Sequence, residues 1–364
     1  MPLCRATRSE HGKLGIYLLD KSMRFHSLLG RWFTNSCRKQ IIEERRLLLV
    51  NSLVLKSVDK FTDPWFTADG QKRASVKLQS LKTLWFNTGS LCNLSCNNCY
   101  IESDPRNDRL AYLSLEDVRT FLDEIKAHKL LTKLIGFTGG EPFLNPDFLR
   151  ILHLTLGKGF DVLVLTNGFR RIERYKNELL GLREQYGEKL QLRISLDHYS
   201  PAVHEKERGE RTFEPTLKMA KWLFDQGFRL SIAGRAVETE SHVEALRGYQ
   251  SLLKKREIGL NADSSDHLVI FPEMNLDLEV PEITVDCWSI LDKQPEQQMC
   301  ASERMIVRRK GQSQPVVLPC TLLAYDSQFD LGSTLESAEK SVQLNHKFCA
   351  QFCVLGGASC SSTA

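Results

Sequence analysis

The sequence lacks a long hydrophobic run and a large net charge. The longest near-apolar stretch, Leu47–Leu55, is interrupted by Asn51 and Ser52 and falls well short of the roughly 20 residues of a membrane-spanning helix. The 364 residues carry 49 Lys and Arg against 45 Asp and Glu, a net charge of +4, which is too small to indicate a nucleic-acid or membrane partner. We therefore expect an ordinary globular chain, long enough for one large domain and a smaller one.

Cysteine is absent from residues 100–286, although the chain contains eleven. The count is odd, and the N-terminus lacks the basic, apolar and small-residue order of a secretory signal, so the disulfide framework of a secreted protein is disfavoured. Metal ligation by thiolates in a reducing compartment fits better. We expect a cytoplasmic location.

Acidic residues are scarce at the N-terminus: the first 60 residues hold 12 Lys and Arg against 5 Asp and Glu. An Arg-rich, acid-poor leader is typical of an organellar transit peptide, but we favour the simpler interpretation, an extension without a role in chemistry. We predict a basic N-terminal extension over residues 1–75 and leave organellar targeting open.

Apolar β-rich runs alternate with amphipathic stretches of helical period from residue 81 onward, as in β/α units. Strands are predicted at 83–87, 134–138, 161–166, 190–196, 229–233 and 267–271, with helices near 114–128, 147–158, 172–186, 214–226 and 242–256. Six such units in series predict an α/β fold with a parallel sheet and helices outside, either doubly wound or a partly closed barrel. We assign residues 76–280 to this core and residues 281–364 to a second, Cys-containing domain.

Polar and glycine residues follow every predicted strand, where ligands of parallel α/β sheets gather. Asn167 precedes Gly168, a pair that favours a left-handed turn, and we assign Asn167 to that turn rather than to a ligand. The charged run 205–211, like His198 and His204 before it, follows the fourth strand. Because such runs are usually solvated loops, we assign no catalytic base.

Three cysteines follow the first strand at spacings of three and two residues: Cys92, Cys96 and Cys99. A closed zinc site requires a fourth ligand, which Cys287 or a tail cysteine would have to supply. Three thiolates can instead hold three irons of an iron–sulfur cube and leave the fourth iron open. We favour the iron–sulfur interpretation.

This loop resembles the Cys-x3-Cys-x2-Cys loop of the radical S-adenosylmethionine (radical SAM) superfamily. The family has an aromatic residue before the last cysteine or nearby; here Asn98 precedes Cys99 and Tyr100 follows it. The resemblance implies a partial (β/α)6 TIM-like barrel and a [4Fe–4S] cluster on the three thiols. In that family the open iron binds S-adenosylmethionine (SAM), beside which Tyr100 would lie.

Further strand ends strengthen the resemblance. The turn Gly139–Gly140–Glu141 would let a ligand approach the backbone and offer a carboxylate to a cationic amine, and the family uses such a turn for the methionine amino group. Ser195 and Asp197 lie on one side of their strand, where the family binds the ribose hydroxyls. The alternatives are a plain β-to-α turn at Glu141 and, for Asp197, capping of the turn that follows it.

The fifth strand end carries Ile232, Gly234 and Glu238, which resembles the family's adenine-flanking pattern although Leu230 replaces a glycine. Arg235 suits a bidentate contact with the methionine carboxylate. A salt bridge from Arg235 to a neighbouring glutamate is the alternative.

The tail holds five further cysteines, enough for one complete cluster or one zinc site: Cys300, Cys320, Cys349, Cys353 and Cys360. Their arrangement resembles the SPASM/twitch auxiliary-cluster domains of radical SAM enzymes that modify peptides. We predict one auxiliary [4Fe–4S] cluster and treat Cys287 as a structural thiol.

The resemblance implies reductive SAM cleavage to a 5′-deoxyadenosyl radical, which abstracts a substrate hydrogen. The expected partners are a peptide or small-molecule substrate and a one-electron reductant such as flavodoxin or ferredoxin. Two alternatives stay open: a radical SAM enzyme acting on a small metabolite, as in molybdopterin-precursor synthesis, and a non-enzymatic iron–sulfur electron carrier or sensor.

Overall fold

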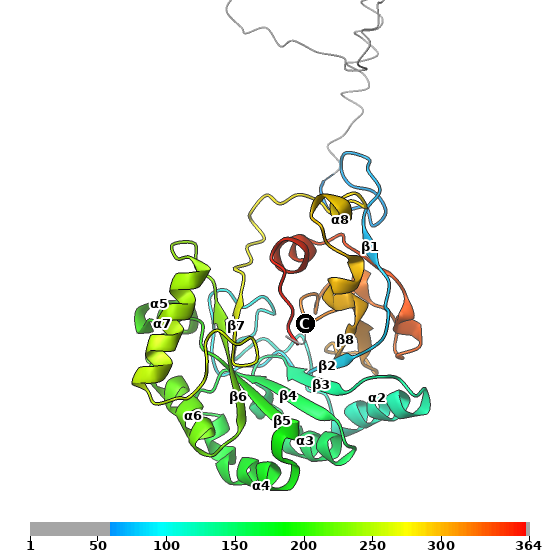
Figure 1. Ribbon diagram of the computed structural model, residues 1–364. Coiled ribbons are helices and arrows are strands. Elements are labelled where there is room, and N and C mark those ends of the chain that lie inside the picture. The colour runs from blue at the N-terminus through cyan, green and yellow to red at the C-terminus, as the bar shows by residue number, and fades with distance from the viewer. Residues whose placement is uncertain (1–58, 362–364) are drawn as a thin grey trace, which may run out of the picture. The chain divides into compact units, whose positions relative to one another are not determined.

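A computed structural model describes residues 59–361 of the chain. Residues 1–58, which contain most of the predicted basic extension, lie outside the described part. Six parallel strands follow one another across a single sheet: β2 (Thr83–Asn87), β3 (Leu134–Thr138), β4 (Asp161–Thr166), β5 (Leu190–Ser195), β6 (Arg229–Arg235) and β7 (Leu268–Phe271). Because neighbours in sequence are neighbours in the sheet, the chain winds in one direction, which excludes the doubly wound alternative. The sheet is an open, partial barrel (Figure 1).

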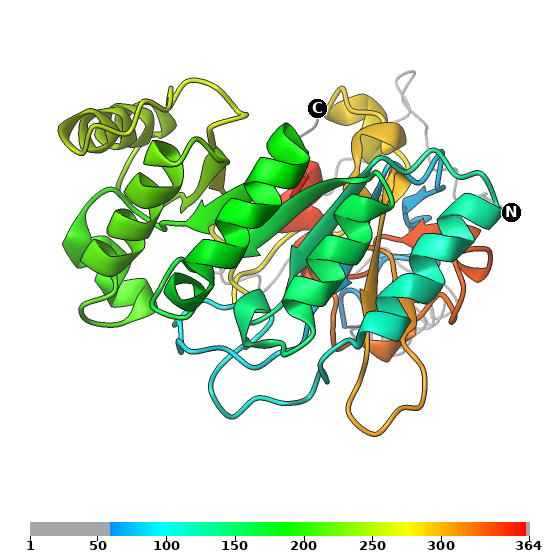
Figure 2. The ribbon, with the colours of Figure 1, turned by 90° about the horizontal axis from the view of Figure 1, so that it is seen from below.

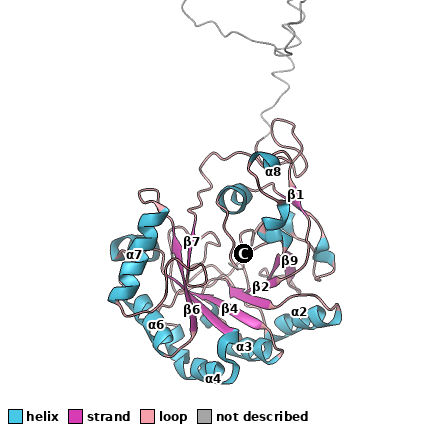
Figure 3. Cartoon of the chain, viewed as in Figure 1, coloured by secondary structure: helices cyan, strands magenta, loops and turns pink. Residues whose placement is uncertain are grey.

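Helices follow the strands and cover the outer side of the curved sheet (Figures 1, 2 and 3). Five were predicted to within a few residues: α2 (Leu115–Ala127), α3 (Phe148–Gly157), α4 (Lys176–Tyr186), α6 (Phe213–Asp225) and α7 (His242–Lys255). Capping boxes at Ser114 and Ser241 fix the starts of α2 and α7. The sequence analysis missed α5 (Pro201–Arg208), which occupies part of the predicted charged loop. No helix within residues 59–361 is long and apolar enough to cross a membrane.

Aromatic side chains fill the space between the sheet and the helices. Phe86 on β2 stacks on Phe137 of β3 with ring centroids 5.7 Å apart, and Phe148 of α3 meets Phe137 edge-on at 5.5 Å. Such pairs add to the stabilisation that burial of apolar area provides. This packing holds the strands in register, so their carboxyl ends meet at one rim.

The tail extends the sheet. Strand β8 (Glu303–Val307) pairs in parallel with β2, and β9 (Val316–Leu318) pairs antiparallel with β8. The other described tail elements are short: α8 (Cys287–Ile290), a π-helix over Cys349–Leu355, and β10 (Val342–Gln343), which pairs with β1 (Ser75–Val76). The second domain predicted at residue 281 therefore shares the sheet of the core.

Residues 359–361 reach side chains of the parallel sheet, on β5 and β8. Glu303 accepts hydrogen bonds from Trp85 Nε1 at 2.6 Å and from Ser361 Oγ at 2.7 Å. Arg193 Nη1 of β5 donates to the Cys360 carbonyl at 2.7 Å. These side chains and their hydrogen bonds occupy the interior of the barrel. Space for a ligand is therefore found at the rim.

Candidate functional site

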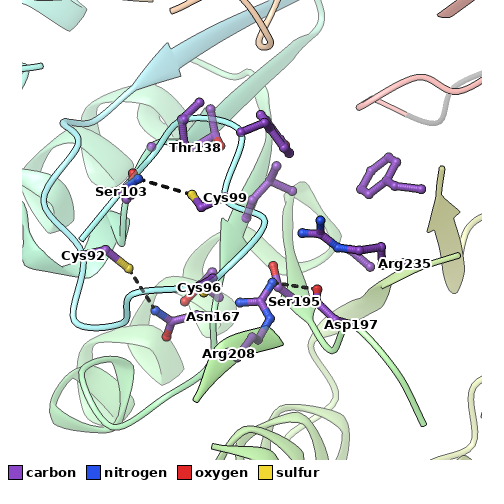
Figure 4. Close-up of a pocket in the computed structure, with 18 of the residues that line it drawn as sticks. Cys92, Cys96, Cys99, Ser103, Thr138, Asn167, Ser195, Asp197, Arg208 and Arg235 are labelled. Carbon is purple, nitrogen blue, oxygen red and sulfur yellow. Dashed lines mark hydrogen bonds and ion pairs between the residues drawn. The ribbon is translucent and has the colours of Figure 1, made fainter. Parts of the chain in front are cut away.

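A cavity that is partly open to solvent lies at the carboxyl ends of the strands (Figure 4). We call it the first cavity. It is lined by the three thiols of the cysteine loop together with residues from the ends of β3 to β7. The lining includes most of the residues that the sequence singled out: Cys92, Cys96, Cys99, Tyr100, Gly139, Gly140, Asn167, Ser195, Asp197, Gly234 and Arg235.

The three thiols surround the cavity without meeting at one point. Asn167 Nδ2 lies 3.6 Å from Cys92 Sγ, and the Ser103 backbone N–H donates to Cys99 Sγ at 3.3 Å. Within residues 59–361 no three His, Cys, Asp or Glu side chains are close enough to hold a single metal ion. A zinc site would require that convergence, whereas an iron–sulfur cube binds each thiolate through a different iron. Burial raises the pKa of the Cys92 thiol to about 12, so its thiolate requires a compensating cation.

The two glycines after β3 allow the cysteine loop to pack against the strand end. A Cβ on Gly140 would lie 2.1 Å from the Leu91 carbonyl oxygen, and one on Gly139, which has a φ of +133°, would lie 2.6 Å from that of Gly89. The Gly140 N–H donates to the Gly89 carbonyl at 2.8 Å. Glycine is therefore required here for a close backbone contact.

The Glu141 carboxylate is buried behind the cavity and is absent from its lining. It accepts hydrogen bonds from Thr166 Oγ1 at 2.9 Å and from the backbone N–H groups of Asn167 (3.0 Å) and Phe143 (3.2 Å). Burial raises the pKa of Glu141 to about 7. In this structure Glu141 ties the β3 turn to the end of β4, and its predicted contact with a ligand amine stays a prediction.

Asp197 forms an ion pair inside the cavity with Arg208, the last residue of α5. Their Oδ1 and Nη2 atoms are 2.9 Å apart, and the two side chains are only 7% and 12% exposed. Burial alone would raise the pKa of Asp197, but the Arg208 and Arg235 guanidinium groups hold it below its usual value. Asp197 Oδ2 and Arg208 Nε are buried without a partner within the described residues. Because unpaired buried polar atoms are costly, this pair is poised to bind a polar ligand.

Arg208 is the site residue that the sequence analysis missed, because it lies in the run 205–211 that we expected to be solvated. Helix α5 begins with Pro201, a residue favoured at the first helical position. His204 and Arg208 are four residues apart and so share one helix face. His204 is fully buried. Proline after Ser200 was the sequence signal for this helix.

Arg235 and Asn167 also hold the cysteine loop. Arg235 Nη1 donates to the Asn98 carbonyl at 3.0 Å, and Asn167 Nδ2 donates to Asn93 Oδ1 at 2.9 Å. The salt bridge proposed as an alternative for Arg235 is not among the ion pairs of the described residues. Glu238, from the predicted adenine-flanking pattern, is exposed, whereas Glu240 is bonded to His198 Nε2 at 3.1 Å.

Four tail cysteines line a second cavity: Cys300, Cys320, Cys349 and Cys353. The rest of its wall is largely apolar and includes Met299, Leu322 and Phe348. Burial raises the pKa of Cys320 to about 12, and the nearby Cys300 thiolate and Glu303 carboxylate add to this effect. The second cavity therefore offers a complete set of four thiols in apolar surroundings.

The remaining described cysteines lie apart from both cavity linings. Cys360 is buried; its Sγ lies 3.1 Å from Thr321 Oγ1, and its backbone N–H contacts Met299 Sδ at 3.2 Å. Cys287 on α8 accepts from the Thr284 N–H at 3.4 Å. Cys360 packs in the same apolar cluster as Cys320 and Cys353 but does not line the second cavity, so its predicted role as a cluster ligand stays a prediction.

Fold and site together define a class of protein: an open parallel barrel whose strand ends surround a cavity lined by thiols. Residues 86–248 match the Radical SAM superfamily. The chain is 32% identical over 187 residues to the antilisterial bacteriocin subtilosin biosynthesis protein AlbA of Bacillus subtilis (strain 168), a match that covers 51% of this chain and 39% of AlbA. It is 28% identical over 142 residues to a GTP 3′,8-cyclase of Actinobacillus succinogenes, covering 38% and 40% of the two chains.

Among solved structures, Streptococcus suis SuiB bound to S-adenosylmethionine is similar with a TM-score of 0.51 and 14% identity, covering 72% of this chain and 65% of SuiB. That likeness supports the partial-barrel fold. The chain spans about two fifths of the length of the curated relatives named above. Residues 86–248 form a radical SAM domain.

Proposed function

We propose that this chain is a radical SAM enzyme that uses a [4Fe–4S] cluster and SAM to modify a peptide or protein. The observation that carries the proposal is the first cavity, where three thiols face a buried Asp197–Arg208 pair with unpaired polar atoms. An electron carrier or sensor would have no use for such a pair beside the cluster. A cofactor that bears both hydroxyl and carboxylate groups satisfies it.

The residues present fit this cofactor pair. Cys92, Cys96 and Cys99 would hold the cluster, which supplies the electron that cleaves SAM into a hydrogen-abstracting radical. Asp197 would accept from ribose hydroxyls, with Ser195 beside it. The Arg208 and Arg235 guanidinium groups suit the methionine carboxylate. The walls of the cavity orient the bound groups and limit the access of water.

Cys300, Cys320, Cys349 and Cys353 would hold the auxiliary [4Fe–4S] cluster. Four thiols complete such a cluster, so the second cavity requires no ligand from a substrate or from Cys360. Its apolar wall excludes water from the cluster. The expected roles for this centre are electron transfer or support of the substrate-facing wall, which includes Phe352 from the π-helix.

Apolar side chains form the outer wall of the first cavity and favour a peptide substrate. Phe271 and Phe352 lie with ring centroids 5.5 Å apart, and Met274 and Pro272 line the same side. Such a wall suits an amino-acid side chain better than a phosphorylated nucleotide. The likeness to AlbA points the same way.

The likeness to GTP 3′,8-cyclase supports a second candidate, a small-metabolite substrate. GTP itself is the probe for this candidate. If it is correct, GTP will be consumed and will stimulate 5′-deoxyadenosine release. Synthetic peptides encoded by small reading frames beside the gene are the matching probes for the first candidate. The electron donor, flavodoxin or ferredoxin, is part of the proposal in both cases.

Anaerobic reconstitution tests the cofactor assignment. We expect about eight irons per chain, from two four-iron clusters, and release of 5′-deoxyadenosine from SAM with a strong reductant. Cys96→Ala is expected to abolish this release, whereas Cys287→Ala, a matched control outside both cavities, is expected to retain it. Zinc in place of iron, or unchanged cleavage by Cys96→Ala, would contradict the proposal.

A further inference from the structure

Tyr325 joins the tail to the segment that follows Cys99. It lies five residues after Cys320, one of the thiols of the second cavity. Its hydroxyl donates to the Ile101 carbonyl at 2.8 Å and accepts from Asn107 Nδ2 at 3.1 Å. The half-buried ring of Tyr325 also lies beneath the Arg109 guanidinium, whose carbon is 3.8 Å from the ring centroid, within range of a cation–π contact.

The segment that Tyr325 contacts, residues 101–110, touches two of the three thiol positions of the first cavity. The Ser103 N–H donates to Cys99 Sγ at 3.3 Å (Figure 4). The Cys92 N–H donates to the Asp104 carbonyl at 3.1 Å. A shift of this segment would therefore disturb the hydrogen bond to the Cys99 thiol and would move the backbone of Cys92.

Further contacts hold the segment together and fix it to the chain on either side. Asn107 Nδ2 also donates to the Glu102 carbonyl at 2.6 Å, and Glu102 forms an ion pair with Arg109. Ser90 Oγ donates to the Asn107 carbonyl at 2.8 Å. Apart from Ser90, these bonds lie within the segment.

The tail holds the two ends of this segment differently. At the far end the Lys310 N–H donates to the Arg109 carbonyl at 2.8 Å and Lys310 pairs with Asp108. Near the cysteine loop the Tyr325 hydroxyl makes the contacts with Ile101 and Asn107.

We propose that Tyr325 is a positioning residue for the first cluster: its hydroxyl holds segment 101–110 so that Cys92 and Cys99 keep the geometry that the cluster requires. The inference rests on the proposed function for its cluster, but the positioning of the segment is a property of the chain itself. The tail would then support the cluster of the first cavity and also carry the auxiliary cluster.

The variant Tyr325→Phe tests this proposal, because it removes two hydrogen bonds and keeps the ring under Arg109. In the metal-free chain, we expect amide hydrogen exchange in residues 101–110 to accelerate about tenfold. Tyr186→Phe is the matched control, since Tyr186 lies on the outer helix α4. In that variant, amide exchange in residues 101–110 should equal that of the unmodified chain. Unchanged exchange in Tyr325→Phe would overturn the proposal.

The reconstituted chain provides a second readout. Only the first cluster has an open iron, so only its electron paramagnetic resonance signal should shift when SAM is added. In Tyr325→Phe we expect this SAM-dependent signal to weaken or change shape while the signal of the second centre stays constant. A change confined to the second centre would also contradict the proposal. Absence of any SAM-dependent signal in the unmodified chain would instead contradict the proposed function, and the exchange experiment would still decide the role of Tyr325.

Discussion

The first cavity has charged and polar side chains, Asp197, Arg208 and Arg235 among them, opposite an apolar wall, whereas the second is bordered largely by Leu, Val, Phe and Met. Both are lined by thiols, but the first has three and the second has four. A site with three thiols and unpaired polar atoms suits a cofactor that enters and leaves during turnover. A site with four thiols and an apolar wall suits a centre that stays in place. The number of thiols and the polarity of the wall together distinguish a site for an exchanging cofactor from a site for a permanent cluster.

The largest difference that this comparison predicts concerns iron and SAM cleavage. The triple variant Cys92→Ala, Cys96→Ala, Cys99→Ala and the double variant Cys349→Ala, Cys353→Ala should each lose about four of about eight irons. Only the triple variant should stop 5′-deoxyadenosine release completely. Iron analysis and chromatography of the products measure both effects. If the double variant also stops SAM cleavage, the assigned division of roles is wrong.

The dependence of stability on pH should also differ between the two sites, because the second cavity is lined by no acidic or basic side chain other than its cysteines. Glu141 beside the first cavity has a pKa raised from 4.5 to about 7. Between these values the folded chain binds a proton that the unfolded chain has lost, so the free energy of unfolding falls as pH rises. The contribution is at most about 3 kcal/mol.

Urea unfolding of the metal-free chain between pH 4.5 and 8 measures this contribution. In Glu141→Gln we expect a smaller decrease in unfolding free energy over that range. Glu214→Gln, an exposed carboxylate on α6, serves as the control and should keep the decrease of the unmodified chain. An equal decrease in Glu141→Gln would show that Glu141 is ionised throughout the range.

A smaller effect is expected from the polar wall of the first cavity. Arg208→Gln should weaken SAM binding about thirtyfold, or about 2 kcal/mol, because a charge-assisted contact is lost. Lys206→Gln removes an exposed positive charge from the same helix and should change the affinity less than twofold. Equilibrium binding of SAM to the reconstituted chain measures both. Equal losses would mean that the net charge of α5, rather than contact with Arg208, controls affinity.

The strands of the core were predictable because each apolar run is short and is followed by glycine or polar residues. Strands β2, β3 and β4 have the predicted bounds, and β6 ends two residues later than predicted. Helix α5 was missed because its buried face consists of His204 and Arg208, polar residues that leave no apolar stripe in the sequence. Its burial depends on Asp197 and Phe213, which only the fold brings near.

The sequence predicted which residues gather at the candidate site better than it predicted where their side chains point. Spacing placed the thiols, Ser195, Asp197 and Arg235 at one rim, because strand ends of a parallel sheet meet there. It did not reveal that the Glu141 side chain turns toward Thr166. Nor did it reveal that four of the five tail cysteines, without Cys360, line one cavity, because that arrangement depends on where the fold places residues 359–361.

Strand β8 has a consequence for synthesis of the chain. It pairs Glu303 with Thr83, so the ribosome adds 220 residues between the two partners. At about 5–20 residues per second, β2 waits roughly 10–40 s with one edge unpaired. An exposed strand edge favours association with other chains. Slow maturation and a need for chaperones during translation follow from the position of this one strand.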